Sequence, residues 1–161
     1  MKALIVIDVQ NDYFTGGRFP LEGADEALQR TLTLIGNARR NGALVIAVQH
    51  LAAADAPFFA TGTIGAELHP ALQSVLDGDT VVIKQEADSF LGTNLGELLK
   101  QNDVDAIHLA GMMTQHCVTH TALSPDASGF DITIHAEGCA APTRALSALA
   151  ISGLKARFSV V

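Results

Sequence analysis

The sequence predicts an α/β fold of the doubly wound, Rossmann-like type, an open parallel sheet of about six strands with helices on both faces. Two observations lead to this prediction. Short apolar runs recur along the chain, and segments with the periodicity of amphipathic helices separate them. Strands that are apolar throughout are buried on both faces, as in a parallel sheet covered by helices. We expect residues 1–161 to form one domain.

Six segments of five or six residues are expected to form the strands. Each is mostly apolar and contains valine or isoleucine, which favour extended backbone. In chain order they are residues 3–7, 43–48, 80–84, 106–111, 131–136 and 157–161. A connection with several prolines and glycines follows the second strand as far as about residue 70, and its length indicates a functional loop.

Four helices are expected between these strands. Their apolar residues recur near helical spacing, and Gly42 and Thr93 stand at helix ends where glycine and threonine are favoured. The helices are residues 24–42, 93–102, 115–128 and 143–156. Pro125 lies inside the third helix and removes a backbone hydrogen bond there. We therefore expect that helix to kink or end early, with a local loop at 124–129.

The composition excludes several classes of function. The chain has 10 basic and 17 acidic side chains, a formal net charge of −7, and no basic cluster, so we expect no nucleic-acid partner. Six apolar residues precede Asp8, too few for a signal peptide or a membrane span, so we expect no membrane partner. Cys117 and Cys139 form no C-x-x-C pattern, which fits the reducing cytoplasm.

Three chemically active side chains stand where predicted strands end. Asp8 ends the first strand, Lys84 ends the third, and Cys117 follows the fourth. Because ligands bind beyond the carboxyl ends of such strands, we expect these side chains to converge. A helix start and a nearby ammonium are expected to stabilise the Cys117 thiolate, while a carboxylate could take the thiol proton. Cys139 is interpreted as a small buried residue.

The segments that hold these residues resemble a known family. They are ALIVIDVQNDYF at 3–14, VIKQEADSF at 82–90 and AGMMTQHCVTHTA at 110–122. In order and spacing they resemble the isochorismatase-like cysteine hydrolases, which include nicotinamidases and N-carbamoylsarcosine amidohydrolase. The resemblance covers nearly the whole chain.

The resemblance implies a mechanism. Asp8, Lys84 and Cys117 correspond to the family's catalytic triad, and the Met112–Met113 peptide bond to a cis bond that shapes an oxyanion hole. The backbone N–H groups of Met113 and Cys117 would be its donors. The implied reaction cleaves an amide or carbamoyl C–N bond of a small molecule through a thioester on Cys117, without a cofactor. The resemblance also implies a homo-oligomer, a dimer or larger.

The substrate and any metal are less well defined. Aromatic and polar residues near the strand ends are the expected pocket residues: Tyr13, Phe14, Gln49, Phe58, Phe59 and His116. Nicotinamidases carry an Asp-x-His metal pattern after the second strand, whereas His50 and Ala52 stand near those positions here. We therefore expect no metal, although His50 and His69 could bind one together.

Two alternative functions stay open beside the amide hydrolase. One is a catalytically idle relative that acts in binding or assembly, for which Pro125 and the chain end at Val161 leave room. The other is an isochorismatase-type ether hydrolase, which needs no cysteine, so that Cys117 favours amide chemistry. A phospho-receiver module is excluded, because it would carry an aspartate after its third strand, where this chain has Lys84.

Overall fold

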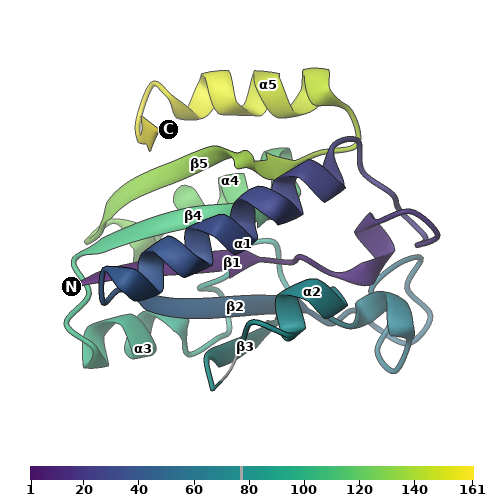
Figure 1. Cartoon of the computed structure of the whole chain (residues 1–161), viewed down its shortest axis with the longest axis horizontal. Helices are drawn as coiled ribbons and strands as arrows, with labels where there is room; N and C mark the ends of the chain where they lie inside the picture. The colour runs from purple at the N-terminus through teal and green to yellow at the C-terminus, as the bar shows by residue number, and fades with distance from the viewer. Residues whose placement is uncertain (77) are drawn as a thin grey trace.

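Six parallel strands form the sheet of the structure, a computed structural model that describes residues 1–76 and 78–161 (Figure 1). Their order across the sheet is β3-β2-β1-β4-β5-β6. The strands are β1 (Lys2–Ile7), β2 (Leu44–His50), β3 (Thr80–Lys84), β4 (Ala106–Met112), β5 (Asp131–Ala140) and β6 (Ser159–Val160). The chain winds outward from β1 in both directions, so the predicted doubly wound α/β fold is confirmed.

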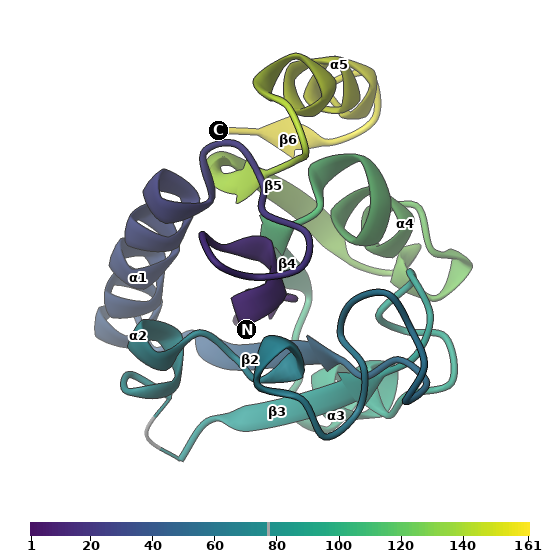
Figure 2. The same cartoon turned by 90° about the vertical axis from the view of Figure 1, so that its right-hand side faces the viewer.

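Helices cover both faces of the sheet (Figure 2). α1 and α2 lie on one face, and α3 and α4 lie on the other. The helices are α1 (Ala24–Arg40), α2 (Pro70–Gln73), α3 (Leu95–Gln101), α4 (Thr119–Ala122) and α5 (Arg144–Leu154). The expected helices are present in shorter form, and α2 is an addition. Within the described part of the chain, no helix combines the length and the apolar character needed to cross a bilayer.

Two layers of apolar side chains, one on each face of the sheet, make up the core. Side chains alternate between the two faces along a strand. Ile5 and Ile7 of β1 pack in the layer with α3, whereas Leu4 and Val6 pack in the layer with α1. All four are buried. The central strand is therefore covered on both sides, which explains its uninterrupted apolar sequence.

Pro125 ends the helical segment after β4 early, as the sequence predicts. α4 stops at Ala122, and Pro125 begins a separate 3-10 turn, Pro125–Ala127. The Ser124 hydroxyl accepts a hydrogen bond from the backbone N–H of Asp126 at 3.3 Å and so caps this turn. At the first position of a turn the missing proline N–H costs no hydrogen bond. The proline is thus accommodated at the first position of a separate turn.

Gly111 allows a close approach between β1 and β4 near their carboxyl ends. It pairs with Ile7 across the sheet, and its φ angle is 129°, a conformation that favours glycine. A Cβ atom at this position would lie 2.0 Å from the carbonyl oxygen of Ile7. The absence of a side chain at Gly111 therefore lets the strand ends that lead to Asp8 and Met112 lie next to each other.

Replacing Gly111 with alanine should destabilise the fold. We expect Gly111→Ala to lower the free energy of unfolding by roughly 3 kcal/mol, because the methyl group meets backbone and strains φ. Gly153→Ala is the matched control, since a Cβ at Gly153 in α5 meets nothing within 4 Å. Helix propensity predicts a gain of about 1 kcal/mol for that control. Urea unfolding measures both, and a Gly111→Ala variant as stable as the parent would contradict the close approach.

Candidate active site

The predicted residues at three strand ends meet around one lysine. Lys84 extends from the end of β3, and its Nζ atom lies 2.9 Å from Asp8 Oδ2 and 3.2 Å from Cys117 Sγ. The side chains of Lys84 and Asp8 are 0% exposed, and Cys117 is 2% exposed. The structure therefore brings together all three residues that the sequence singles out. Their catalytic roles stay predictions.

The loop after β3 holds the ammonium group in place. Lys84 Nζ donates to the carbonyl oxygen of Glu86 at 2.8 Å, and the carbonyl of Ala87 lies 3.5 Å away. Its neighbour on the β2 side is His50 Nδ1, at 3.2 Å. Burial by itself lowers the pKa of Lys84, but its interactions with Asp8 and then with Cys117 outweigh burial and raise the pKa above its usual value. Lys84 is therefore a charged group inside the protein.

Asp8 is a buried carboxylate whose oxygens are available to accept a proton. Its Oδ2 atom is at ion-pair distance from Lys84, yet neither of its oxygens accepts a well-aligned hydrogen bond from the residues that the structure describes. Burial raises the pKa of Asp8 more than Lys84 and Cys117 lower it. Its φ angle of 50° is one that aspartate tolerates. Asp8 is therefore a stronger base than an exposed aspartate.

Cys117 lies in a tight turn after β4. This segment, here called the cysteine turn, is the π-helical turn Thr114–Val118. The Met112–Met113 peptide bond before it is cis, as the resemblance implies. The Met113 carbonyl accepts a hydrogen bond from the N–H of Val118 at 3.2 Å. The turn therefore begins directly after the cis bond, and the oxyanion hole of Met113 and Cys117 stays a prediction.

A hydrogen bond between two side chains anchors the cysteine turn to α5. The hydroxyl oxygens of Thr114 and Ser147 are 2.8 Å apart, and Thr114 is fully buried. Thr119 Oγ1 also donates to the Thr114 carbonyl at 2.7 Å. The first residue of the turn is thus fixed from both its side chain and its backbone.

The expectation of a stabilised thiolate is wrong for the resting site. Burial, together with the negative charge of Asp8, raises the pKa of Cys117 to about 12, although Lys84 opposes the shift. Cys117 does lie near the start of a helical segment, because the π-helical turn runs directly into α4, but the turn is buried. Desolvation of the sulfur is therefore the larger effect. At neutral pH Cys117 carries its proton, and Asp8 is the neighbouring group that could accept it.

Aromatic side chains stand beside the triad. Tyr13 and Phe59 are buried with ring centroids 4.5 Å apart, and the half-buried Phe58 lies 6.0 Å from Tyr13. Burial and then the charges of Cys117 and Asp8 raise the pKa of Tyr13, which places its ring near them. These three expected pocket residues therefore form one aromatic cluster.

The other expected pocket residues have different neighbours. Phe14 packs against the ring of His69, with centroids 4.4 Å apart. Gln49 donates its side-chain N–H to the carbonyl of Ala66 at 2.8 Å, so its amide secures a loop. His116 is exposed on the cysteine turn. The structure does not gather Phe14, Gln49 and His116 with the aromatic cluster, because loop contacts unknown from the sequence fix the first two.

Two buried polar side chains that sequence analysis missed hold the loops around the site. Gln10 exchanges hydrogen bonds of 2.8 Å with the backbone N–H and C=O of His50, and it also donates to the carbonyl of Ala66. Asp12 accepts a hydrogen bond from the N–H of Phe59 at 2.7 Å. The sequence feature that could have revealed Gln10 and Asp12 is the polar stretch that directly follows the apolar first strand. These contacts fix His50 and Phe59 relative to β1.

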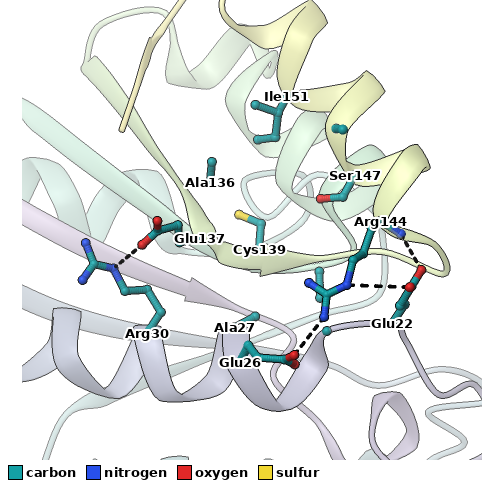
Figure 3. Close-up of a pocket in the computed structure, with 13 residues that line it drawn as sticks. Glu22, Glu26, Ala27, Arg30, Ala136, Glu137, Cys139, Arg144, Ser147 and Ile151 are labelled. Atoms are coloured by element: carbon teal, nitrogen blue, oxygen red, sulfur yellow. Dashed lines mark hydrogen bonds and ion pairs between the residues drawn. The ribbon is translucent and has the colours of Figure 1, made fainter.

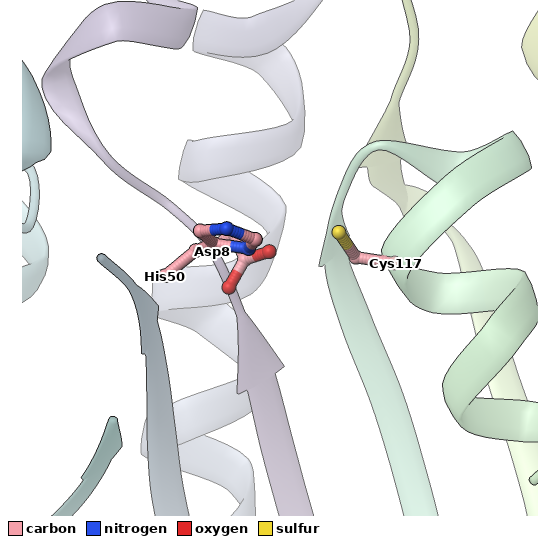
Figure 4. A group of neighbouring side chains, drawn as sticks. All are labelled: Asp8, His50 and Cys117. Atoms are coloured by element: carbon pink, nitrogen blue, oxygen red, sulfur yellow. The ribbon is translucent and has the colours of Figure 1, made fainter. Parts of the chain in front are cut away.

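Asp8, His50 and Cys117 each offer an atom within 4.8 Å of the other two (Figure 4). Carboxylate, imidazole and thiolate are all possible zinc ligands. However, the Lys84 ammonium contacts all three at 2.9–3.2 Å, so a positive charge already lies among them. His69 does not join the group, since its Nδ1 atom accepts a hydrogen bond at the start of α2. The donor set therefore does not fit a divalent cation.

Cys139 does not belong to the group around Lys84 and lies instead in the wall of a cavity. This cavity of about 500 Å³ lies between α1, β5 and α5 (Figure 3). Its charged side chains pair with one another, as in the 2.8 Å contact between Arg144 and Glu26. Cys139 is buried, burial raises its pKa to about 12, and its sulfur donates to the His135 carbonyl. The interpretation of Cys139 as a small buried residue is consistent with this environment.

Comparisons with known proteins agree on one family. A family model described as the isochorismatase domain matches residues 2–161. The chain is 34% identical over 142 residues to an uncharacterized isochorismatase family protein of Bacillus subtilis, covering 88% of this chain and 78% of the relative. It is 37% identical over 125 residues to streptothricin hydrolase of Streptomyces noursei, covering 76% of this chain and 43% of that protein. The solved structure of a nicotinamidase from Bacillus subtilis is similar with a TM-score of 0.89 and 27% identity, covering 99% and 98% of the two chains.

Alkylation should reveal the raised pKa of Cys117. Because iodoacetamide reacts with the thiolate, we expect the rate at Cys117 to rise about tenfold per pH unit from pH 7 to 9, without a plateau. Mass spectrometry follows Cys117 and Cys139 separately. The urea-unfolded protein is the control, in which both rates should level off above a pKa of about 8.5. A plateau near pH 7 at Cys117 in the folded protein would show a stabilised thiolate instead.

Removing the lysine should leave an unpaired buried charge. We expect Lys84→Met to lower the free energy of unfolding by roughly 3 to 5 kcal/mol, because Asp8 would lose its counterion. The double variant Asp8→Asn/Lys84→Met removes both charges and should recover most of that loss. Urea unfolding at neutral pH measures each variant. Equal losses in the single and double variants would mean that charge pairing is not the cause.

Proposed function

The chain belongs to the isochorismatase family, and we propose that it is a cysteine hydrolase that cleaves the C–N bond of a small amide or carbamoyl compound. The observation that carries the proposal is the contact of one buried ammonium, that of Lys84, with both Asp8 and Cys117. Such a grouping provides a nucleophile, a base and a fixed positive charge within one site.

In the first half of the proposed reaction, Asp8 accepts the proton of the Cys117 thiol. The sulfur attacks the amide carbonyl carbon, and the carbonyl oxygen becomes an oxyanion that accepts hydrogen bonds from the N–H groups of Met113 and Cys117. When the intermediate collapses, the C–N bond breaks and Asp8 gives its proton to the leaving nitrogen. The products of this half are ammonia or an amine and a thioester on Cys117.

In the second half, water hydrolyses the thioester. Asp8 accepts a proton from the water as its oxygen attacks the thioester carbon. The C–S bond then breaks, the acid product leaves, and the proton returns from Asp8 to the sulfur of Cys117. Lys84 stabilises each negative charge that forms during the cycle, and because it is buried its effect is stronger than in water.

Several observations favour this proposal over the two alternatives. An idle relative would not need a buried charge pair beside a cysteine, since breaking such a pair is costly and an apolar replacement is often more stable. An ether hydrolase would not need Cys117. Two similar proteins, a nicotinamidase and streptothricin hydrolase, are named as enzymes, which supports a hydrolytic role.

The aromatic cluster of Tyr13, Phe58 and Phe59 supports a small substrate with a flat or apolar part. We also propose a homo-oligomer, for which the exposed side chains of Leu123 and Leu149 offer apolar contact area. A cytoplasmic location completes the proposal, and it agrees with two free thiols in the structure.

Loss of the nucleophile should abolish turnover. We expect Cys117→Ala to release ammonia from a panel of small primary amides at least about 1,000-fold more slowly than the parent protein, since the thioester cannot form. Cys139→Ala is the matched control and should keep the parent rate. A coupled glutamate dehydrogenase assay measures the ammonia. Equal rates in Cys117→Ala and the parent protein would overturn the proposed mechanism.

A further inference from the structure

His50 has no part in the proposed steps, yet it contacts the lysine at their centre. Its Nδ1 atom lies 3.2 Å from Lys84 Nζ. An ammonium group can only donate hydrogen bonds, so Nδ1 accepts here and the ring proton lies on Nε2. Burial, and then the positive charges of Lys84 and His116, lower the pKa of His50 to about 4. The imidazole is therefore neutral near pH 7, in the tautomer that accepts from Lys84.

The carboxylate of Asp8 lies next to the Lys84 ammonium without accepting a well-aligned hydrogen bond, and the other acceptors around Lys84 explain why. Nζ has three N–H groups, and four acceptors lie near it in suitable directions: the Glu86 carbonyl at 2.8 Å, Cys117 Sγ at 3.2 Å, His50 Nδ1 at 3.2 Å and, farther away, the Ala87 carbonyl at 3.5 Å. Asp8 Oδ2 is also near, at 2.9 Å, but neither carboxylate oxygen accepts a well-aligned hydrogen bond within the described ranges. The contact between Lys84 and Asp8 is therefore an ion pair whose angles are poor for a hydrogen bond.

We propose that His50 is a positioning residue that draws one N–H of Lys84 away from Asp8. The carboxylate then keeps the nearby positive charge while both of its oxygens remain free to accept the proton of Cys117. Without an acceptor at His50, the released N–H would turn toward Asp8, because the charged Oδ2 atom at 2.9 Å is a nearer and stronger acceptor than the Ala87 carbonyl at 3.5 Å. That bond would stabilise the carboxylate and weaken it as a base.

The backbone around His50 is built to keep this contact. Gln10 binds both the N–H and the C=O of His50, and the register of the sheet pairs His50 with Lys84 directly. The Phe59 ring lies 5.9 Å from the imidazole. The position of His50 is thus fixed by backbone contacts and by the Phe59 ring, none of which involves the Lys84 side chain.

Two substitutions at His50 distinguish the effect of its hydrogen-bond acceptor from the effect of the space that its ring fills. In His50→Asn the side-chain oxygen can occupy the position of Nδ1 and accept from Lys84, whereas His50→Leu has a similar size and no acceptor. The titratable groups around Asp8 are Lys84, Cys117, Tyr13 and His50, and both variants leave the first three unchanged. The two variants therefore differ in the feature that the inference concerns.

The direct measurement is the pKa of Asp8. Carbon-13 NMR of protein labelled at the aspartate carboxyl groups follows the titration, and Asp8→Asn assigns the signal. We expect His50→Leu to lower the pKa of Asp8 by about one unit relative to the parent, the effect of one added charge-assisted hydrogen bond, while His50→Asn stays near the parent value. An equal pKa in the Leu and Asn variants, or a higher one in His50→Leu, would overturn the inference.

The effect of His50 on turnover rests on the proposed function. A second measurement tests the positioning role and the proposed function separately. If the protein hydrolyses small amides, the acid limb of the kcat/KM profile should move to lower pH in His50→Leu, and the rate on its plateau should fall. A shifted Asp8 pKa without amide hydrolysis would keep the positioning role and refute the proposed function. Amide hydrolysis with no shift would refute the positioning role alone.

Discussion

A positively charged ammonium group removed from water is the constraint on which the site depends. Burial of an unpaired ion costs several kcal/mol, so Lys84 is stable only when its partners surround it. These partners come from the residue after β1, from the end of β2, from the loop after β3 and from the cysteine turn. Lys84 therefore fixes four segments of the chain relative to one another. Asp8 and Cys117 share this neighbour.

The same burial determines how the protons are distributed. Desolvation raises the pKa of the Cys117 thiol and that of the Asp8 carboxyl group together. The resting site is therefore a thiol beside a carboxylate of increased basicity, with the ammonium next to both. In this arrangement a thiolate forms at neutral pH only when the proton of Cys117 moves to a neighbouring base.

The sequence predicts the fold and the three central residues for a clear physical reason. Buried parallel strands are short and apolar, so their ends are visible, and residues at those ends must share one edge of the sheet. Asp8, Lys84 and Cys117 are found in this way. The expectation for Pro125 also holds, because the cost of proline inside a helix is local. These predictions need no knowledge of how distant loops pack.

Other features of the site depend on tertiary contacts that no local pattern contains. Gln10 and Asp12 look like surface residues after a strand, but both are buried and bind loops far along the chain. Gln49 was expected to face substrate and instead holds the Ala66 carbonyl. The ionisation of Cys117 was misjudged because burial outweighs the effect of a helix start. In each case the deciding quantity is burial, which depends on the whole fold.

The hydrogen bond between Thr114 and Ser147 links the buried cysteine turn to α5, a helix at the surface. Thr114 is buried at the start of the cysteine turn, whereas Ser147 lies on α5 in the wall of the cavity that contains Cys139. α5 is largely exposed, with Leu149 71% accessible to solvent. The position of the cysteine turn is consequently coupled to a surface helix, so a change at Ser147 would be felt three residues before Cys117.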